Sequence, residues 1–156
     1  MLVFSEYQTD TIDLALDFYG YEDCPKNYEF GPSVRDNFVL HFITEGKGVF
    51  HFNKKEIHLE AGDLFLLPKN KVTYYKADEE EPWSYYWIGI SGTKVSDFMR
   101  FSTLHEKGFL KKTEVETEKI GQFMEQLVHK AEASKMTSHY QLHLLSQIYE
   151  LLFLIS

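Results

Sequence analysis

Residues 35–91 read RDNFVLHFITEGKGVFHFNKKEIHLEAGDLFLLPKNKVTYYKADEEEPWSYYWIGIS. Short segments rich in Phe, Val, Ile, Tyr and Trp alternate here with residues that favour turns. The turn residues are Gly46, Gly48, Gly62-Asp63 and Pro68. This pattern is typical of an antiparallel sandwich or barrel, and a helix would not tolerate such spacing. The stretch therefore predicts a small β-barrel, a fold whose interior commonly binds a ligand.

Alternating apolar and polar residues predict seven strands in the chain. We expect them near residues 12–18, 38–44, 48–52, 56–59, 64–67, 71–77 and 85–90, with a loop at 21–34 after the first. Successive side chains of a strand point to opposite faces, so Trp83, Tyr85 and Trp87 share one face of the last strand. Which of its faces lies inside the barrel decides what the barrel can bind.

The apolar period changes to a helical one after Gly92. Val95 and Met99 predict a short helix that packs beneath the barrel. Thr113-x-x-Glu116 is a capping box that predicts the start of a second helix, and a third helix is expected from about Thr137. The chain therefore ends in a helical hairpin.

Length and composition favour one ordinary domain. The chain has 156 residues, of which 44% are hydrophobic, so it can bury a core. The apolar residues are dispersed, and no run approaches the length of a membrane span. The N-terminus lacks the features of a secretory signal, and Cys24 is the only cysteine, which fits a reducing compartment. We therefore expect a cytoplasmic protein without membrane contact.

The charge balance argues against DNA binding by this chain itself. Sixteen basic and twenty-four acidic residues give a formal net charge of −8, and residues 78–81 form an acidic run. A chain with this charge is repelled by DNA phosphates.

An ordered set of motifs resembles a known family. Glu45-Gly46-Lys47-Gly48, followed by Ala61-Gly62-Asp63 and an apolar run to Pro68, looks like a cupin-type barrel. More narrowly, the chain resembles the effector domain of AraC/XylS-family transcription regulators, in the Gram-positive branch that controls multiple-sugar and raffinose-type operons. This resemblance rests on Gly20-Tyr21-Glu22 with Cys24, Gly31-Pro32 with Arg35, Leu40-His41-Phe42, Ala77-Asp78 and the segment PWSYYWIG at 82–89.

The resemblance implies a mainly β fold, a cupin-like (jelly-roll) barrel followed by an α-helical hairpin. It makes residues 1–156 one effector-binding and dimerisation domain, with an N-terminal arm at 1–10, the barrel at 11–91 and a helical part at 92–156. The arm is then a candidate switch element. The family's helix-turn-helix DNA-binding domain is absent from this chain, so DNA would be contacted only through that missing domain.

The positions that bind metal in cupins do not hold ligands here. Residues 32–39 contain no His or Glu, and Thr73 stands where such cupins carry a further His after Pro68. The only His pair at helical spacing, His139 and His143, lacks the Glu that a metalloprotease needs, and such a bare pair is more often a solvated helix face. Cys24 has no recognisable catalytic partner. We expect no metal, no cofactor and no enzymatic activity.

Aromatic residues and an arginine on the barrel form a combination suited to a sugar. An aromatic face accepts the C–H side of a pyranose, while Arg, His and Tyr side chains satisfy its hydroxyls. The family resemblance implies that Trp87 stacks on the sugar, that Tyr85 and Tyr74 add polar contacts, and that Arg35 stands near the sugar-binding Arg. The candidate ligand-binding residues are Trp87, Tyr85, Tyr74, Arg35, His41 and Tyr28, the last on a loop that can close the barrel mouth.

Each candidate also has a purely structural interpretation. Trp87 can be an ordinary core residue, and Tyr74 can simply close the barrel end. The Tyr85 hydroxyl can bond a neighbouring strand, and Arg35 can pair with a nearby acid at the surface. His41 faces either the cavity or a polar outer layer.

The last helix carries an apolar stripe at Leu145, Ile148, Leu152 and Ile155. The stripe can pack back on the preceding helix, at Ile120 and Leu127, or it can pair two subunits. We favour a homodimer through the C-terminal helices, because the stripe is wider than one partner helix covers.

The sequence thus predicts a non-enzymatic sensor that binds a small sugar, dimerises, and controls a fused DNA-binding domain. Two alternatives remain open. The first is a small cupin enzyme, such as a sugar isomerase or epimerase, which would need a metal or an acid/base pair in the barrel. The second is a dimerisation module whose barrel is filled by its own side chains.

Overall fold

A computed structural model describes residues 2–6, 13–134 and 138–156. The strands are β1 (Leu2–Glu6), β2 (Ala15–Asp23), β3 (Glu29–Ser33), β4 (Phe38–Glu45), β5 (Lys47–Phe52), β6 (Lys55–Glu60), β7 (Leu64–Leu67), β8 (Thr73–Ala77), β9 (Ser84–Ser91) and β10 (Phe109–Leu110). The helices are α1 (Thr93–Met99), α2 (Thr103–Lys107), α3 (Glu118–Ser134) and α4 (Ser138–Ile155).

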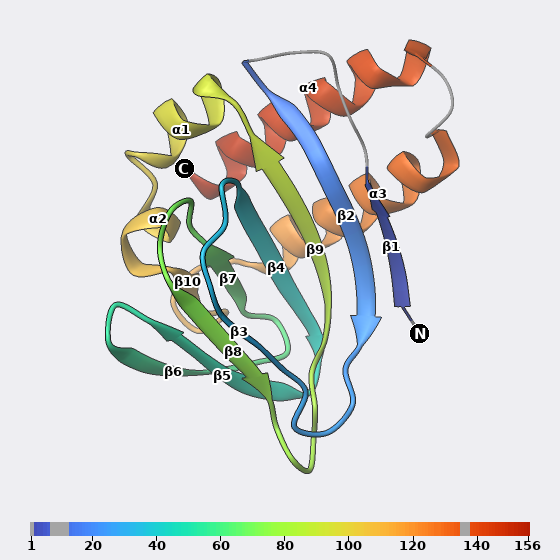
Figure 1. Ribbon diagram of the computed structural model, residues 1–156. Coiled ribbons are helices and arrows are strands. Elements are labelled where there is room, and N and C mark those ends of the chain that lie inside the picture. Colours follow the sequence, from blue (N-terminus) through green and yellow to red (C-terminus); the bar gives the residue numbers. More distant parts are fainter. Residues whose placement is uncertain (1, 7–12, 135–137) are drawn as a thin grey trace.

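The strands form two antiparallel sheets. The larger sheet has the order β1-β2-β9-β4-β7-β10, and the smaller has the order β3-β8-β5-β6. The helices α3 and α4 lie across one side of the larger sheet, and the smaller sheet lies on the other (Figure 1). The expected mainly β, cupin-like fold with C-terminal helices is therefore confirmed, as a sandwich of two separately hydrogen-bonded sheets.

The larger sheet is buried on both faces, which gives the molecule two cores. Side chains of β2, β4, β7 and β9 that face the helices pack with residues of α1 to α4. Side chains on the opposite face pack against the smaller sheet. Strand β9 shows the division most simply, since Tyr85 and Trp87 belong to the core between the sheets and Ile88 and Ile90 to the core under the helices. The predicted alternation of this strand is confirmed.

Strand β2 departs from the predicted alternation. The sequence suggests one apolar face for its even-numbered residues, but the pairing of β2 with β9 shifts between Leu16 and Phe18. A bulge of this kind inserts one extra residue and turns the following side chains over. Leu16 and Tyr19 therefore face the helices, while Phe18 faces the smaller sheet.

Helix α3 begins later than the capping box predicts. Residues 112–114 form a turn, and the first helical residue is Glu118. The hydroxyl of Thr117 donates to the carbonyl oxygen of Gly62 at 2.5 Å, which fixes the start of the helix to the turn before β7. One turn further on, a Cβ at Gly121 would lie 2.2 Å from the Phe42 ring, so only glycine allows the helix to approach the sheet this closely.

Helix α4 packs the apolar stripe predicted for dimerisation against its own chain. Ile148, Leu152 and Ile155 are at most 3% exposed in the core under the helices, and Leu145 packs against the same core. The large hydrophobic side chains that α4 exposes in its described part are Tyr149 and Phe153. The predicted seam is thus occupied within the protomer. None of the described helices is long and apolar enough to span a membrane.

The packing of α4 predicts unequal effects for two substitutions on this helix. Leu152→Ala should lower the free energy of unfolding by about 2–5 kcal/mol, because it leaves a cavity in the core. Glu150→Ala, on the exposed face, should change it by less than about 0.5 kcal/mol. Urea denaturation followed by circular dichroism, at one fixed protein concentration, measures both values. Equal losses would contradict the orientation of α4.

Candidate ligand-binding site

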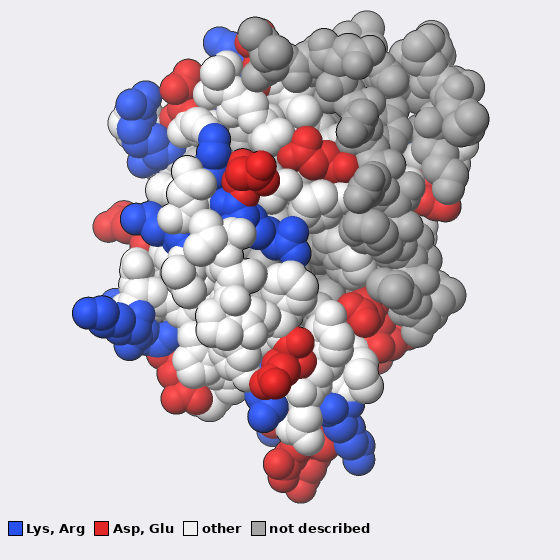
Figure 2. Space-filling view, viewed as in Figure 1, with Lys and Arg blue, Asp and Glu red and all other residues white. Residues whose placement is uncertain are grey.

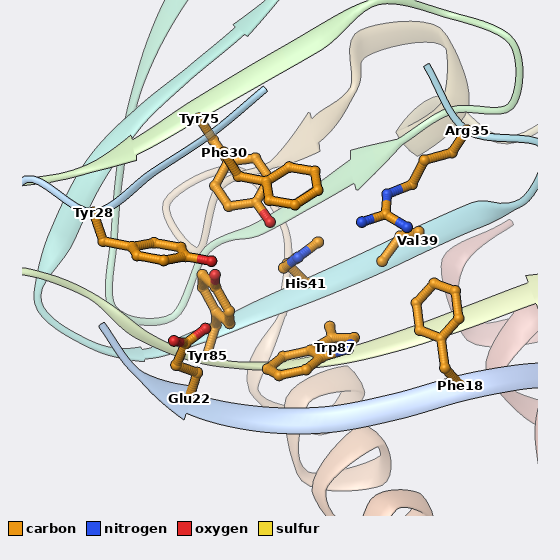
Figure 3. A pocket seen from close by; sticks show the side chains of 10 residues that line it. All are labelled: Phe18, Glu22, Tyr28, Phe30, Arg35, Val39, His41, Tyr75, Tyr85 and Trp87. Atoms are coloured by element: carbon orange, nitrogen blue, oxygen red, sulfur yellow. The ribbon is translucent and has the colours of Figure 1, made fainter. Parts of the chain in front are cut away.

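A cavity of about 420 Å³ opens between the two sheets. Its walls come from β2, β3, β4, β8 and β9 and from the loop between β3 and β4, so segments far apart in the sequence meet there (Figure 3). The lining residues are Phe18, Glu22, Tyr28, Phe30, Arg35, Val39, His41, Tyr75, Tyr85 and Trp87. This is the size of a small-molecule site, near the lower end of the usual range of about 300–1,000 Å³.

Trp87 and Tyr85 enter the cavity from β9. Strand alternation aims both side chains away from the helices, and their rings meet edge to face with centroids 5.8 Å apart. Trp87 remains 9% exposed, whereas Trp83 on the same face is fully buried. Of the two tryptophans, Trp87 is therefore the one whose indole a molecule in the cavity can reach.

Arg35 is held in the cavity by aromatic rings. Its guanidinium carbon lies 5.5 Å from the ring centroid of Phe18 and 5.0 Å from that of Phe30. These rings come from different sheets, so the cation–π contacts fix the guanidinium across the gap between them. The buried Nε of Arg35 has no hydrogen-bond partner, and no carboxylate of the described residues lies within ion-pair distance of Arg35. The surface pairing with a nearby acid is thus not formed.

His41 presents a neutral imidazole to the cavity. The side chain is 2% exposed and stacks on Phe65 with a centroid distance of 4.3 Å. Burial, with the Arg35 charge adding to it, lowers the pKa of His41 to about 3. Its Nδ1 has no partner. A buried polar atom without a partner is uncommon, and this one belongs to a residue that lines the cavity.

Buried hydroxyls complete the polar lining. Burial raises the pKa of Tyr75 and of Tyr85, so both phenols stay protonated and can donate hydrogen bonds. Burial also raises the pKa of Tyr28 and that of the thiol of Cys24, the latter to about 12. Cys24 is therefore a protonated core residue.

Five of the six predicted ligand-binding residues line this one cavity: Trp87, Tyr85, Arg35, His41 and Tyr28. Tyr74 does not. It lies on the outer face of β8, where its hydroxyl donates to Glu29 Oε2 at 2.5 Å and its ring contacts His51. Adjacent strand residues point to opposite faces, so Tyr75 is the tyrosine that faces the cavity.

Sequence reasoning did not select several lining residues. Phe18 was missed because the bulge in β2 reverses the expected alternation of its side chains. Glu22 was missed because β2 runs to Asp23, into the segment that the sequence predicts as a loop. Phe30 and Tyr75 are aromatic residues on β3 and β8, and pattern alone does not say which face of those short strands is inner. Val39 reads as an ordinary core position.

The described residues contain no group of three or more His, Cys, Asp or Glu side chains that could hold a metal ion. The side chain of His139, in the predicted pair with His143, lies outside the described residues. Of the predicted N-terminal arm, residues 2–6 form β1 and pair with β2, while residues 1 and 7–10 lie outside the described part.

Comparison with known proteins decides the family. A family model for the AraC-like ligand binding domain matches residues 15–152. The chain belongs to this family. The predicted resemblance to AraC-type effector domains is therefore confirmed, and the match covers both the strands that form the cavity and the helices α3 and α4.

Curated relatives of the chain are named as operon regulators. The Msm operon regulatory protein of Streptococcus mutans is 47% identical over 105 residues, which covers 67% of this chain and 38% of that protein. The raffinose operon transcriptional regulatory protein of Pediococcus pentosaceus is 42% identical over 62% of this chain and 36% of its own length. The lactose operon transcription activator of Staphylococcus xylosus is 33% identical over 63% of this chain and 35% of its length. The chain thus matches little more than a third of these relatives.

Comparison with solved structures gives matches at low sequence identity. The protein YhaK from Escherichia coli superposes with a TM-score of 0.50 at 14% identity, over 59% of this chain and 45% of that one. The cupin domain of Cnp3 from Schizosaccharomyces pombe matches with a TM-score of 0.47 at 16% identity, over 64% of this chain and 70% of that one. At such identities the likeness concerns the fold alone.

The buried His41 predicts a pH dependence of stability. Its folded-state pKa of about 3 lies below the unfolded value of about 6.5, so below pH 6.5 the unfolded chain binds a proton that the folded chain does not. Stability should therefore fall as the pH drops from about 6.5 towards 3. Between pH 7 and pH 5 the wild type should lose about 2 kcal/mol more than His41→Phe, which cannot titrate there.

Urea denaturation of both proteins at the two pH values tests this expectation. All other titrating groups are shared, so the difference between the two losses isolates His41. Identical losses in the wild type and in His41→Phe would show that the imidazole is not held neutral by burial.

Proposed function

We propose that this chain is the effector-binding domain of a sugar-operon regulator, and that it binds a small sugar in the cavity between the sheets. One observation carries the proposal. The cavity combines the indole of Trp87 with two buried nitrogens, Nε of Arg35 and Nδ1 of His41, that have no hydrogen-bond partner. Aromatic surface beside unmatched polar atoms suits a ligand that is flat and apolar on one side and rich in hydroxyls around its edge.

A sugar matches this combination of groups. The C–H face of a pyranose packs on Trp87, while its hydroxyl oxygens accept from Arg35 and the phenols and a hydroxyl donates to the neutral His41. The names of relatives such as the raffinose and lactose operon regulators support the same class of ligand. A cavity of about 420 Å³ favours a mono- or disaccharide over a long oligosaccharide.

The binding signal would leave the cavity through the larger sheet. Strands β2 and β9 each turn one face to the cavity and the other to α3. On the helix side, Tyr19 of β2 donates to Glu132 Oε2 at 2.7 Å, and Tyr86 of β9 lies 3.4 Å from Glu125 Oε1. A ligand that favours one arrangement of these strands would thereby bias α3. Such coupling is usually worth about 1–3 kcal/mol, and it requires that the ligand bind the two arrangements unequally.

DNA contact in this proposal belongs to a segment outside the chain. The formal net charge is −8. Figure 2 shows basic and acidic side chains interspersed on the described part of the visible face, without a continuous basic surface there. Because the relatives are named as regulators, we infer a regulatory and not a catalytic role for the domain.

A homodimer through α4 would use a different surface from the predicted stripe. Ile148, Leu152 and Ile155 are buried within the protomer. Among the described side chains of α4, the large apolar ones left for a second copy are Tyr149, 43% exposed, and Phe153, 72% exposed. They are one helical turn apart and share a face of α4. We propose that this face pairs two copies of the chain.

Sugar binding is tested by titration of the purified chain with galactose, lactose, raffinose, glucose and sucrose. We expect saturable quenching of tryptophan fluorescence by at least one of them, and loss of that quenching in Trp87→Ala, which keeps Trp83.

Arg35→Gln should weaken the affinity measured by calorimetry about ten- to a hundredfold, because it removes charge-assisted hydrogen bonds. Arg100→Gln, at an exposed arginine that does not line the cavity, serves as the control. No response to any of these sugars would sink the proposal.

Dimerisation is tested by analytical ultracentrifugation of the wild type and of Phe153→Glu. We expect the wild type to sediment as a dimer at micromolar concentrations, and the variant to be monomeric because a charge enters an apolar contact. Phe101→Glu, at a side chain that is 80% exposed outside α4, should remain dimeric. A dimer that persists in Phe153→Glu would exclude this face of α4.

A further inference from the structure

We propose that Glu22 determines specificity in this cavity, and that it restricts the ligand to neutral saccharides and excludes sugar acids and sugar phosphates. The inference rests on the proposed sugar-binding function. It adds to that function a residue that was not among the candidate ligand-binding residues of the sequence, and it adds a charge class for the ligand.

The position of Glu22 follows from the register of the larger sheet. Glu22 of β2 is paired with Tyr85 of β9, and directly paired residues of neighbouring strands project from the same face. Its carboxylate therefore enters the cavity beside the phenols of Tyr85 and Tyr28, while the guanidinium of Arg35 stands at the opposite end (Figure 3). His41 and Trp87 lie between the two charges.

The carboxylate of Glu22 is available to a ligand. It accepts no hydrogen bond from the described residues, and no cation of these residues forms an ion pair with it. Burial raises its pKa, which is the sign of a carboxylate removed from water without full compensation by nearby donors. A carboxylate only accepts hydrogen bonds, so the ligand must present donors at this end. Sugar hydroxyls are such donors.

The two charges at the ends of the cavity define the charge of the ligand. Glu22 and Arg35 carry opposite charges, and His41 between them is neutral. A molecule that fills about 420 Å³ reaches both ends. A neutral sugar meets an acceptor at one end and donors at the other. A ligand with a carboxylate or phosphate would bring a second negative charge into the cavity with Glu22, and the two charges repel each other.

The experiment compares matched neutral and acidic sugars by calorimetry at pH 7.5. The neutral probes are galactose, lactose, raffinose, glucose and sucrose, and the acidic probes are galacturonic acid, glucuronic acid and galactose 6-phosphate. The proteins are the wild type, Glu22→Gln and the control Glu79→Gln, which makes the same change at an exposed residue of the β8–β9 turn. Thermal unfolding of each variant shows whether it is folded, and the isosteric Gln preserves the packing.

We expect the wild type to bind a neutral sugar at least tenfold more tightly than its acidic counterpart. Glu22→Gln should lose about ten- to a hundredfold in affinity for that neutral sugar, because hydrogen bonds to a charged acceptor are replaced by weaker ones. Its preference for neutral over acidic sugars should shrink by a similar factor. Glu79→Gln should behave as the wild type.

The failures of the two proposals are distinguishable. If no saccharide binds the wild type, the sugar-sensor function falls and this inference falls with it. If neutral sugars bind but acidic sugars bind equally well, or if Glu22→Gln leaves the preference unchanged, the role of Glu22 is refuted while the sugar-sensor function stands.

Discussion

The double burial of β9 is the constraint on which the rest of the structure depends. The strand lies between β2 and β4, so its inner side chains fill the space between the sheets and its outer ones carry the helices. A slip of one residue would exchange the two sets, since side chains alternate along a strand. It would place the Trp87 indole under α3 and Ile88 in the cavity. The register of β9 thus fixes both cores and the site together.

The open cavity lowers the stability of the fold, and hydrogen bonds to a ligand would offset this loss. An unpartnered buried polar atom destabilises a fold by about 1–3 kcal/mol, and this cavity keeps two such atoms, on Arg35 and His41. The protein limits the cost by supporting both groups with aromatic rings. Phe18 and Phe30 hold the guanidinium, and Phe65 holds the imidazole. The groups are consequently fixed before any ligand arrives, which reduces the ordering cost of binding.

The sequence predicts those parts of the structure in which apolar residues recur at a regular spacing without interruption. The alternation of β9 correctly placed Tyr85 and Trp87 on one face, and the family motifs pointed to Arg35. Prediction failed where local geometry changes which strand residues point to which face of the sheet. The bulge in β2 hid Phe18, and the Tyr74-Tyr75 pair on a short strand offers two aromatic choices between which only the pairing of β8 decides. In α4, a stripe at helical spacing identifies a buried face but not the chain that buries it.

A common design in β2 and β9 links the site to the helices. Each strand sends two side chains into the cavity, Phe18 and Glu22 from β2 and Tyr85 and Trp87 from β9. Each also sends a tyrosine from its other face to a carboxylate of α3. Backbone hydrogen bonds hold the two strands together, so neither can shift without the other. A ligand that draws Glu22 towards Trp87 would therefore act on both tethers of α3 at once. Because a packed sheet resists gradual deformation, such a pull favours a small movement of the strand pair as a unit over bending of either strand.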